Sequence, residues 1–259
     1  MKKLVKKLFS LSLTKKQQDL IAFRLRKNKA LISGQNNSIR YSDAQLANTS
    51  IQIDGNNNEI IFGPGSVIRN IEIRMHGSNH KLLIGRNCKI NGGEIVFNDK
   101  KGTIYIGDET FINRANFYCR ESSPIYLGPQ CMLAWDIEIY SGDSHPIYEI
   151  ESDRRVNPAE EVSIGSKVWI GSHVQILKGV SIGNCSVIGT RSVVTRNISS
   201  HCIAAGIPAA VVRKGTYWKE SPHHDKPGIL GNEISPSLTI TDGIDIYAYK
   251  HEINKHGRN

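Results

Sequence analysis

The sequence predicts an all-β solenoid, in which short strands wind into a coil of triangular cross-section. Three features predict it: an aliphatic side chain recurs every six residues from 164 to 194, a second row of aliphatic or small side chains runs two residues ahead, and glycine follows four members of the first row. A period of six matches neither a helix nor a single alternating strand. It matches three short strands per coil of about 18 residues, each with one inward side chain. The first row contains Ile164, Ile170, Ile176, Ile182, Ile188 and Val194, and the second contains Val162, Val168, Val174, Val180, Ser186 and Ser192.

The composition agrees with stacked strands. Apolar residues make up 39% of the chain and aromatic residues only 7%, so we expect a core of Ile, Val and Leu. The five cysteines are odd in number and form no C-x-x-C pair. They favour small reduced thiols in a cytoplasmic protein over a disulfide framework.

Residues 1–31 predict a basic amphipathic helix with Leu4, Leu8 and Leu11 along one stripe. Of the 33 basic and 24 acidic residues, ten basic and one acidic lie within 1–29, so the rest of the chain carries equal numbers of each. A basic arm on a neutral body argues against a nucleic-acid-binding domain. The helix either caps the open end of the solenoid or gives residues 1–30 a peripheral contact with anionic lipid at the inner membrane face.

Residues 32–214 predict one continuous solenoid. Short apolar strands at 51–53, 60–62 and 71–73 alternate with turns rich in Asn and Gly, and looser copies of the six-residue pattern begin at 84, 106 and 127. In those copies the pattern predicts inward side chains every six residues. They are Ile90 and Val96, Ile112 and Tyr118, and Leu133 and Ile139.

A polar segment at 141–161 interrupts the pattern and predicts a loop that leaves the solenoid between two coils. Long polar loops on a rigid scaffold often carry functional residues. Residues 215–259 form a C-terminal extension, in which 238–241 resembles a strand.

Three segments resemble the hexapeptide-repeat acetyltransferases, which include galactoside and maltose acetyltransferases: residues 164–174, 188–195 and 205–209. Within that family, Cys131-Met132-Leu133-Ala134 and His145-Pro146-Ile147-Tyr148 most resemble capsular polysaccharide O-acetyltransferases, such as those acting on polysialic acid. The resemblance implies a left-handed parallel β-helix and a homotrimer with active sites between subunits. It also implies acetyl-CoA as co-substrate, a carbohydrate acceptor and no metal.

Two residues are candidates for catalysis. His145 lies in the loop before Pro146, and an imidazole that titrates near neutral pH suits removal of a hydroxyl proton. Trp169 precedes the inward Ile170, so its side chain is predicted to point outward. In the resembling polysaccharide enzymes the equivalent tryptophan lines the active site against the acetyl donor.

The resemblance also implies a groove for coenzyme A along the coil edges. Two departures from the galactoside enzymes concern this groove: Thr190 stands where they have alanine, and Ala210 stands where they have an arginine. The second departure removes a phosphate contact that Arg213 or Lys214 could replace. The residues predicted to contact the donor are Gly171, Ser172, Thr190, Thr195, Arg196 and Arg213.

Polar and aromatic residues ahead of His145 predict the acceptor site. Tyr118 stands where the family has a sugar-contacting asparagine, so the family's monosaccharide specificity is not carried over. The predicted acceptor residues are Asn116, Tyr118, Arg120, Trp135 and Asp143.

Three other functions are alternatives for such a solenoid. A zinc carbonic anhydrase needs converging histidines, two of them typically five residues apart, but His145, His173 and His201 are 28 residues apart and no H-x4-H occurs. N-acetylation of an amino-sugar nucleotide would use nearly the same mechanism and stays open. A non-catalytic binding or scaffold solenoid would need neither the His-Pro loop nor the Trp169 motif.

Overall fold

The computed structural model describes residues 27–41 and 43–220 of the chain. All regular elements in these residues are strands, β1 to β24, which form three sheets called A, B and C here. None of the described residues forms a helix long and apolar enough to cross a membrane. Most of the predicted helix (1–31) and all of the strand-like segment at 238–241 lie outside the described residues.

Each described coil adds one strand to each of the three sheets, except that the last coil adds none to sheet B and two to sheet C. Sheet A contains β1 (Lys29–Ser33), β4 (Ser50–Asp54), β7 (Ile71–His76), β10 (Gly93–Phe97), β13 (Ala115–Cys119), β16 (Ile137–Tyr140), β19 (Gln175–Ile176) and β22 (Val193–Val194). Sheet B contains β2 (Ser38–Arg40), β5 (Glu59–Phe62), β8 (Lys81–Ile84), β11 (Thr103–Ile106), β14 (Ile125–Leu127), β17 (Val162–Ile164) and β20 (Ser181–Ile182). Sheet C contains β3 (Gln45–Ala47), β6 (Val67–Arg69), β9 (Lys89–Ile90), β12 (Phe111–Ile112), β15 (Met132–Leu133), β18 (Trp169–Ile170), β21 (Val187–Ile188), β23 (Cys202–Gly206) and β24 (Ala209–Lys214).

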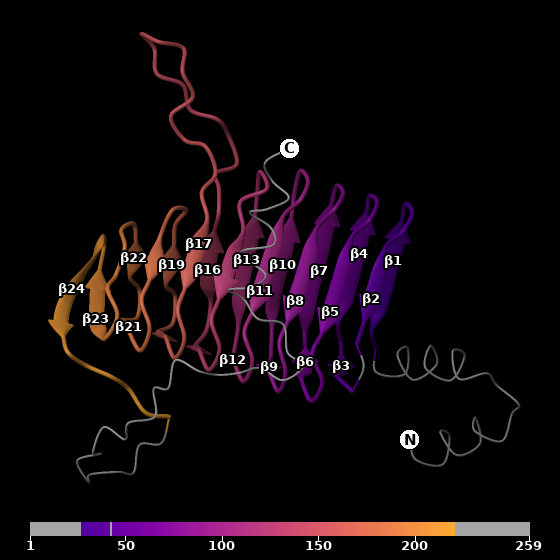
Figure 1. Ribbon diagram of the computed structural model, residues 1–259, viewed down its shortest axis with the longest axis horizontal. Coiled ribbons are helices and arrows are strands. Elements are labelled where there is room, and N and C mark those ends of the chain that lie inside the picture. The colour runs from indigo at the N-terminus through magenta and orange to yellow at the C-terminus, as the bar shows by residue number, and fades with distance from the viewer. Residues whose placement is uncertain (1–26, 42, 221–259) are drawn as a thin grey trace, which may run out of the picture. The chain divides into compact units, whose positions relative to one another are not determined.

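The chain passes through sheets A, B and C in turn, and Figure 1 shows the strands of successive coils stacked in a row. Neighbouring strands pair in parallel, except for the antiparallel hairpin of β23 and β24. This arrangement confirms the predicted left-handed parallel β-helix. Every outward position therefore becomes part of a column that runs along one face of the solenoid.

The aliphatic rows fill the interior of the coil. The six members of the first predicted row are each 2% exposed or less, because each lies directly above its counterpart one coil earlier. Ile139 pairs with Ile176, for example, and Phe117 pairs with Ile139. The hexapeptide period therefore predicted the core of the last coils correctly.

The corners need left-handed backbone, which Asn and Gly tolerate best. Asn48 and Asn70 each adopt a φ of 52° where sheet C turns into sheet A. Gly93 adopts a φ of 123°, and a Cβ atom there would lie 1.9 Å from the carbonyl oxygen of Ala115 on the next coil. These turns explain the Asn- and Gly-rich spacers of the sequence.

Two predictions differ from the structure. Strand β1 begins at Lys29, so the solenoid starts three residues before the predicted boundary at 32 and the helix cannot extend to 31. Val96 and Tyr118 were predicted to face inward but lie on the outer face of sheet A, next to inward Phe97 and Phe117. The upstream strands have five residues, and their two-residue alternation shifts the inward position by one from a strict period of six.

The interruption at 141–161, called the arm here, leaves the solenoid between β16 in sheet A and β17 in sheet B. Figure 1 shows it projecting well beyond the sheets. Its two sides pair with each other: Tyr148 bridges Arg155 in antiparallel fashion, and the Val156 N–H donates to the Ile147 carbonyl at 2.8 Å. The arm is therefore an ordered, hairpin-like projection.

Candidate active site

Asn157 holds the two sides of the arm together at its base. Its Nδ2 donates to the carbonyl of His145 at 2.8 Å and to the Asp143 carboxylate at 2.7 Å. Its Oδ1 accepts the Ile147 N–H at 2.6 Å. Asn157 is only 7% exposed, so these bonds are shielded from water and fix the backbone on both sides of Pro146.

Two ion pairs attach this base to the solenoid. The Lys178 ammonium donates to Asp143 at 2.5 Å, and this bond holds the pKa of the Asp143 carboxyl below its ordinary value, with Asn157 acting in the same direction. Arg155 makes two bonds to Glu121, at 2.9 and 2.6 Å, which lower the pKa of that carboxyl. Both carboxylates therefore remain charged and paired at neutral pH.

The side chain of His145 is exposed to solvent, in contrast to its fixed backbone. The imidazole therefore lies on a backbone turn that hydrogen bonds to Asn157 hold in place, and it is accessible to a substrate or to another subunit. A general base has to meet these conditions before it can accept a proton from a bound hydroxyl.

Trp169 lies on β18 with its ring on the outer face of sheet C, as predicted, and is 41% exposed. The ring of Trp218 lies against it, with centroids 6.1 Å apart, and the Trp218 indole N–H donates to the Lys167 carbonyl at 2.7 Å. Trp169 belongs to an apolar column on this face, set by the strand register. The column contains Phe111, Met132, Trp169, Val187 and Ile203.

The two predicted catalytic residues lie on opposite sides of the solenoid. The arm with His145 leaves at the edge between sheets A and B, whereas Trp169 lies on sheet C, the face opposite that edge. A single copy of the chain therefore does not bring these residues side by side.

The predicted donor residues divide in the same way. Gly171, Ser172 and Thr190 lie together where sheet C turns into sheet A, and the Arg191 N–H bonds the Ser172 carbonyl at 2.8 Å. Arg213 lies on β24, the end strand of sheet C. Thr195 and Arg196 follow β22 and lie at the edge of sheets A and B, on the side of the arm.

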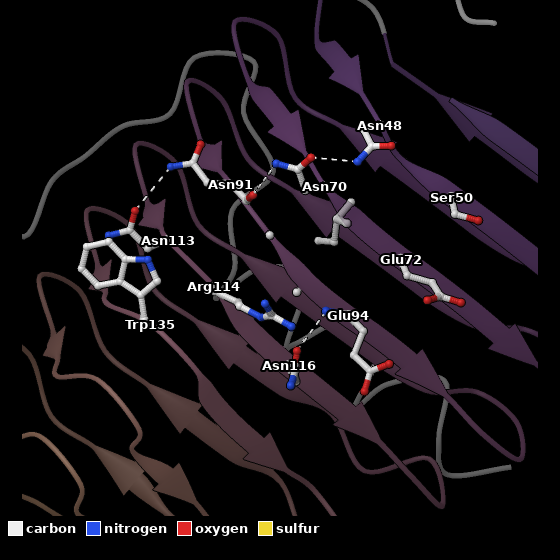
Figure 2. A pocket seen from close by; sticks show the side chains of 13 residues that line it. Asn48, Ser50, Asn70, Glu72, Asn91, Glu94, Asn113, Arg114, Asn116 and Trp135 are labelled. Atoms are coloured by element: carbon white, nitrogen blue, oxygen red, sulfur yellow. Dashed lines mark hydrogen bonds between the residues drawn. The ribbon is translucent and has the colours of Figure 1, made fainter. Parts of the chain in front are cut away.

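The predicted acceptor residues form two groups along sheet A. Asn116 and Trp135 line a groove of about 750 Å³ that crosses several coils, and Tyr118 lies beside it on the same sheet. Figure 2 shows Trp135 near the end of a row of asparagines that follows this groove. Arg120 and Asp143 lie instead at the edge that carries the arm, where the Arg120 N–H bonds Ser141 Oγ at 3.0 Å.

A stacked pair of tyrosines lies between the two groups. The rings of Tyr118 and Tyr140 are 4.8 Å apart and inclined by 12°, and the Tyr118 hydroxyl donates to Glu94. Burial raises the pKa of Tyr118, and its hydrogen bond to Glu94 acts in the same direction. Burial, together with a hydrogen bond to Glu138, raises the pKa of Tyr140 to about 12. Both phenols therefore stay neutral hydrogen-bond donors at physiological pH.

Sequence reasoning missed several residues of these sites: Glu94, Tyr140, Asn157, Lys178 and Trp218. Tyr140 and Glu94 follow from the register of sheet A once coil lengths are known. In the described part of the chain, no three His, Cys, Asp or Glu side chains are grouped as metal ligands would be.

Comparison with known proteins identifies similar chains. The family model "Bacterial transferase hexapeptide (six repeats)" matches residues 161–196. The polysialic acid O-acetyltransferase of Escherichia coli O1:K1 is 34% identical over 134 residues, which cover 52% of this chain and 43% of that protein. The polysialic acid O-acetyltransferase of Neisseria meningitidis is 34% identical over 147 residues, which cover 56% of this chain and 68% of that protein.

Solved structures extend the similarity over most of the solenoid. The polysialic acid-specific acetyltransferase NeuO superposes with a TM-score of 0.72 at 32% identity, covering 77% of this chain and 92% of that chain. The polysialic acid O-acetyltransferase OatWY superposes with a TM-score of 0.71 at 30% identity, covering 77% and 94%. Measured against their full lengths, the chain spans about half of the first curated relatives it matches.

Proposed function

Because the chain belongs to the hexapeptide-repeat acetyltransferases, a family that includes the polysialic acid O-acetyltransferases, we propose that it moves an acetyl group from acetyl-CoA to a polysaccharide hydroxyl. The observation that carries the proposal is the superposition on a polysaccharide acetyltransferase over 92% of that enzyme's chain. The position of His145 on the arm, where Asn157 holds its backbone, supports this proposal, because the imidazole would serve as the base that such a transfer needs.

In the proposed mechanism His145 acts as general base. Its neutral imidazole takes the proton of the acceptor hydroxyl as that oxygen attacks the thioester carbonyl. The tetrahedral intermediate then collapses, the carbon–sulfur bond breaks, and the imidazolium returns the proton to the departing thiolate. The products are an acetyl ester and the free thiol of coenzyme A, and the enzyme is unchanged.

The donor is proposed to lie against sheet C and its edge with sheet A. Ser172 and Thr190 offer hydroxyl and backbone groups there, and Arg213 offers a cation to phosphate. Trp169 would pack against the acetyl end, and its indole N–H or a nearby backbone N–H would stabilise the oxyanion.

We also propose a homotrimer whose active sites lie between subunits. The arm exposes apolar side chains that a lone solenoid leaves in water: Ile147, Tyr148, Ile150 and Val156, with Ile150 fully exposed. The apolar column on sheet C offers a complementary surface on a neighbouring copy. Packing the arm there would bring His145 and Arg196 of one subunit close to Trp169 and Ser172 of the next.

Release of free thiol from acetyl-CoA tests the reaction directly. The assay would use capsular oligosaccharides, monosaccharides and amino-sugar nucleotides as acceptors. We expect polymer-stimulated release that falls by about 10²–10⁴-fold in His145→Ala, with CoA binding retained. His173→Asn is the matched control, because His173 is also exposed and its φ of 58° suits asparagine. Preference for an amino-sugar nucleotide would instead identify an N-acetyltransferase, and absence of both turnover and CoA binding would leave a binding solenoid.

Mixing inactive variants tests the composite site. If His145 and Trp169 act from different subunits, co-expressed His145→Ala and Trp169→Ala chains assemble some sites with both residues intact. Random assembly should restore about a quarter of wild-type activity in a cyclic trimer. No restoration from a mixed trimer would show that both residues act within one subunit.

The reaction is proposed to occur in the cytoplasm, at the inner membrane face if residues 1–30 bind anionic lipid. Pelleting with vesicles of phosphatidylglycerol and phosphatidylcholine tests this contact. The full chain should pellet and a chain lacking residues 1–26, which leaves β1 whole, should not.

A further inference from the structure

The groove on sheet A has the length of an extended ligand. It runs across five successive coils, from Asn48 to Trp135, and four strand spacings of about 4.8 Å give it a length of about 19 Å. Its volume of about 750 Å³ falls in the range of sites that bind small organic ligands and cofactors. A single monosaccharide would leave most of this groove empty.

A row of asparagine amides forms one wall, as Figure 2 shows. The Asn48 side-chain amide donates to Asn70 Oδ1 at 2.8 Å, and the Asn70 side-chain amide donates to the backbone carbonyl of Asn91 at 3.1 Å. Each amide has two N–H donors and two acceptor lone pairs, so these bonds leave hydrogen-bonding capacity toward the groove. A regular array of fixed donors and acceptors suits a ligand with many hydroxyl groups.

Carboxylates and aromatic rings complete the surface. Glu72 and Glu94 lie in one outward column with Asn116, and carboxylates accept hydroxyl hydrogen bonds strongly. Trp135 at one end is 56% exposed and offers a flat apolar face to a sugar ring. From Asn116 the same strand leads to Tyr118 and its stacked partner, and the arm begins just beyond that pair.

The charge of this face is unsuited to a polyanion. In the described strands β4 to β22 of sheet A, Arg74 is the one outward Lys or Arg, and the next cation, Arg120, follows β13 on the side of the arm. Four outward side chains of these strands are acidic: Asp54, Glu72, Glu94 and Glu138. Arg74 is itself bonded to Glu94 at 2.5 Å and lies 3.4 Å from Glu72. Arg114, at the edge of the groove, pairs with Asp136 at 3.3 Å.

We propose that this groove binds several consecutive sugar residues of a neutral polysaccharide, and that the acceptor is therefore an uncharged polymer. The inference rests on the proposed function and names its substrate class. Polysialic acid, the acceptor named for the relatives, carries a carboxylate on every residue and would meet like charge along this face. The bound chain would pass over Tyr118 and Tyr140 to present a hydroxyl at the arm.

Binding without turnover tests the groove. The full chain carrying His145→Ala would be titrated with neutral hexasaccharides of glucose, galactose, mannose and N-acetylglucosamine, and with a hexamer of sialic acid. We expect at least one neutral hexamer to bind at least about 10-fold more tightly than its monosaccharide and than the sialic acid hexamer. Trp135→Ala should weaken that binding about 10-fold, and Glu72→Gln about 3- to 10-fold. Ile207→Ala is the control, since Ile207 is exposed at the far end of the solenoid.

The outcomes separate this proposal from the proposed function. Tighter binding of the sialic acid hexamer, or neutral binding unaffected by Trp135→Ala and Glu72→Gln, would overturn the groove proposal. So would failure of every neutral hexamer to bind. Thiol release with an anionic polymer would then leave the acetyltransferase function intact, whereas loss of both CoA binding and turnover would overturn the function itself.

Discussion

Replacement of Asn157 by alanine tests whether the arm positions His145. The change removes the bonds to the His145 carbonyl, to Asp143 and from the Ile147 N–H, at 2.8, 2.7 and 2.6 Å. At about 0.5–1.5 kcal/mol for each net hydrogen bond, the base of the arm should lose about 1.5–4.5 kcal/mol of local stability. The solenoid should be little affected, because its coils are held by their own parallel pairing.

The expected result is a defect confined to the arm. We expect kcat to fall about 10²-fold, the scale typical of a misplaced catalytic group, while CoA binding and thermal unfolding of the solenoid change little. Trypsin should cut faster after Arg154 or Arg155, since opening the base exposes this segment. Asn157→Asp should be worse than Asn157→Ala, because its carboxylate cannot donate and would face that of Asp143.

Asn184→Ala provides the matched control. The Asn184 amide oxygen accepts a single bond from the Ser166 N–H at 2.8 Å in a solenoid turn away from the arm. This variant should keep wild-type kcat and wild-type cleavage of the arm. Unchanged kcat in Asn157→Ala despite faster arm cleavage would refute the positioning role.

Three further predictions follow from local structure. Gly93→Ala should lower the free energy of unfolding by more than about 3 kcal/mol in chemical denaturation, because the added Cβ would collide with the next coil. Gly215→Ala is the control and should cost only about 1 kcal/mol, since Gly215 has a φ of 68° and no atom within 4 Å of the added Cβ. Thiol titration of the native protein should modify Cys185 first, since it is the partly exposed cysteine; burial raises the pKa of Cys88 to about 11 and those of Cys119 and Cys131 to about 12. Because the Lys178 bond lowers the pKa of Asp143, the carboxylate supports the arm above its ordinary pKa of 3.8, and this support is lost as the pH falls below that value. The protection of residues 141–161 from hydrogen exchange, measured relative to the intrinsic exchange rate at each pH, should therefore fall only in strong acid, and Asp143→Asn should remove this dependence.

The repeated core positions could be predicted from the sequence, but hydrogen bonds between residues far apart in the chain could not. Inward positions from Ile164 to Val194 were correct because the period there is strictly six. Val96 and Tyr118 were wrong because longer upstream coils shift the alternation by one residue. The arm was foreseen as a polar break in the pattern, but the role of Asn157 was not, since its bonds to His145 span 12 residues and form only when the arm folds back.

The division of the predicted site over two sides of the solenoid has a physical cause in the repeat. Residues that are six apart in the sequence lie one-third of a turn apart in the coil, so Trp169 and Gln175 belong to different faces. Residues a whole coil apart share one face, so side chains of similar chemistry can gather in a column. The column is apolar from Phe111 to Ile203 around Trp169 on sheet C, and it carries amide and carboxylate groups around Asn116 on sheet A. The residues predicted to bind the donor and the acceptor thus lie on separate surfaces of this solenoid, and the solenoid alone has no wall that joins those two surfaces. The arm and a neighbouring sheet C face can supply that wall, and this makes assembly between copies the step on which the proposed chemistry depends.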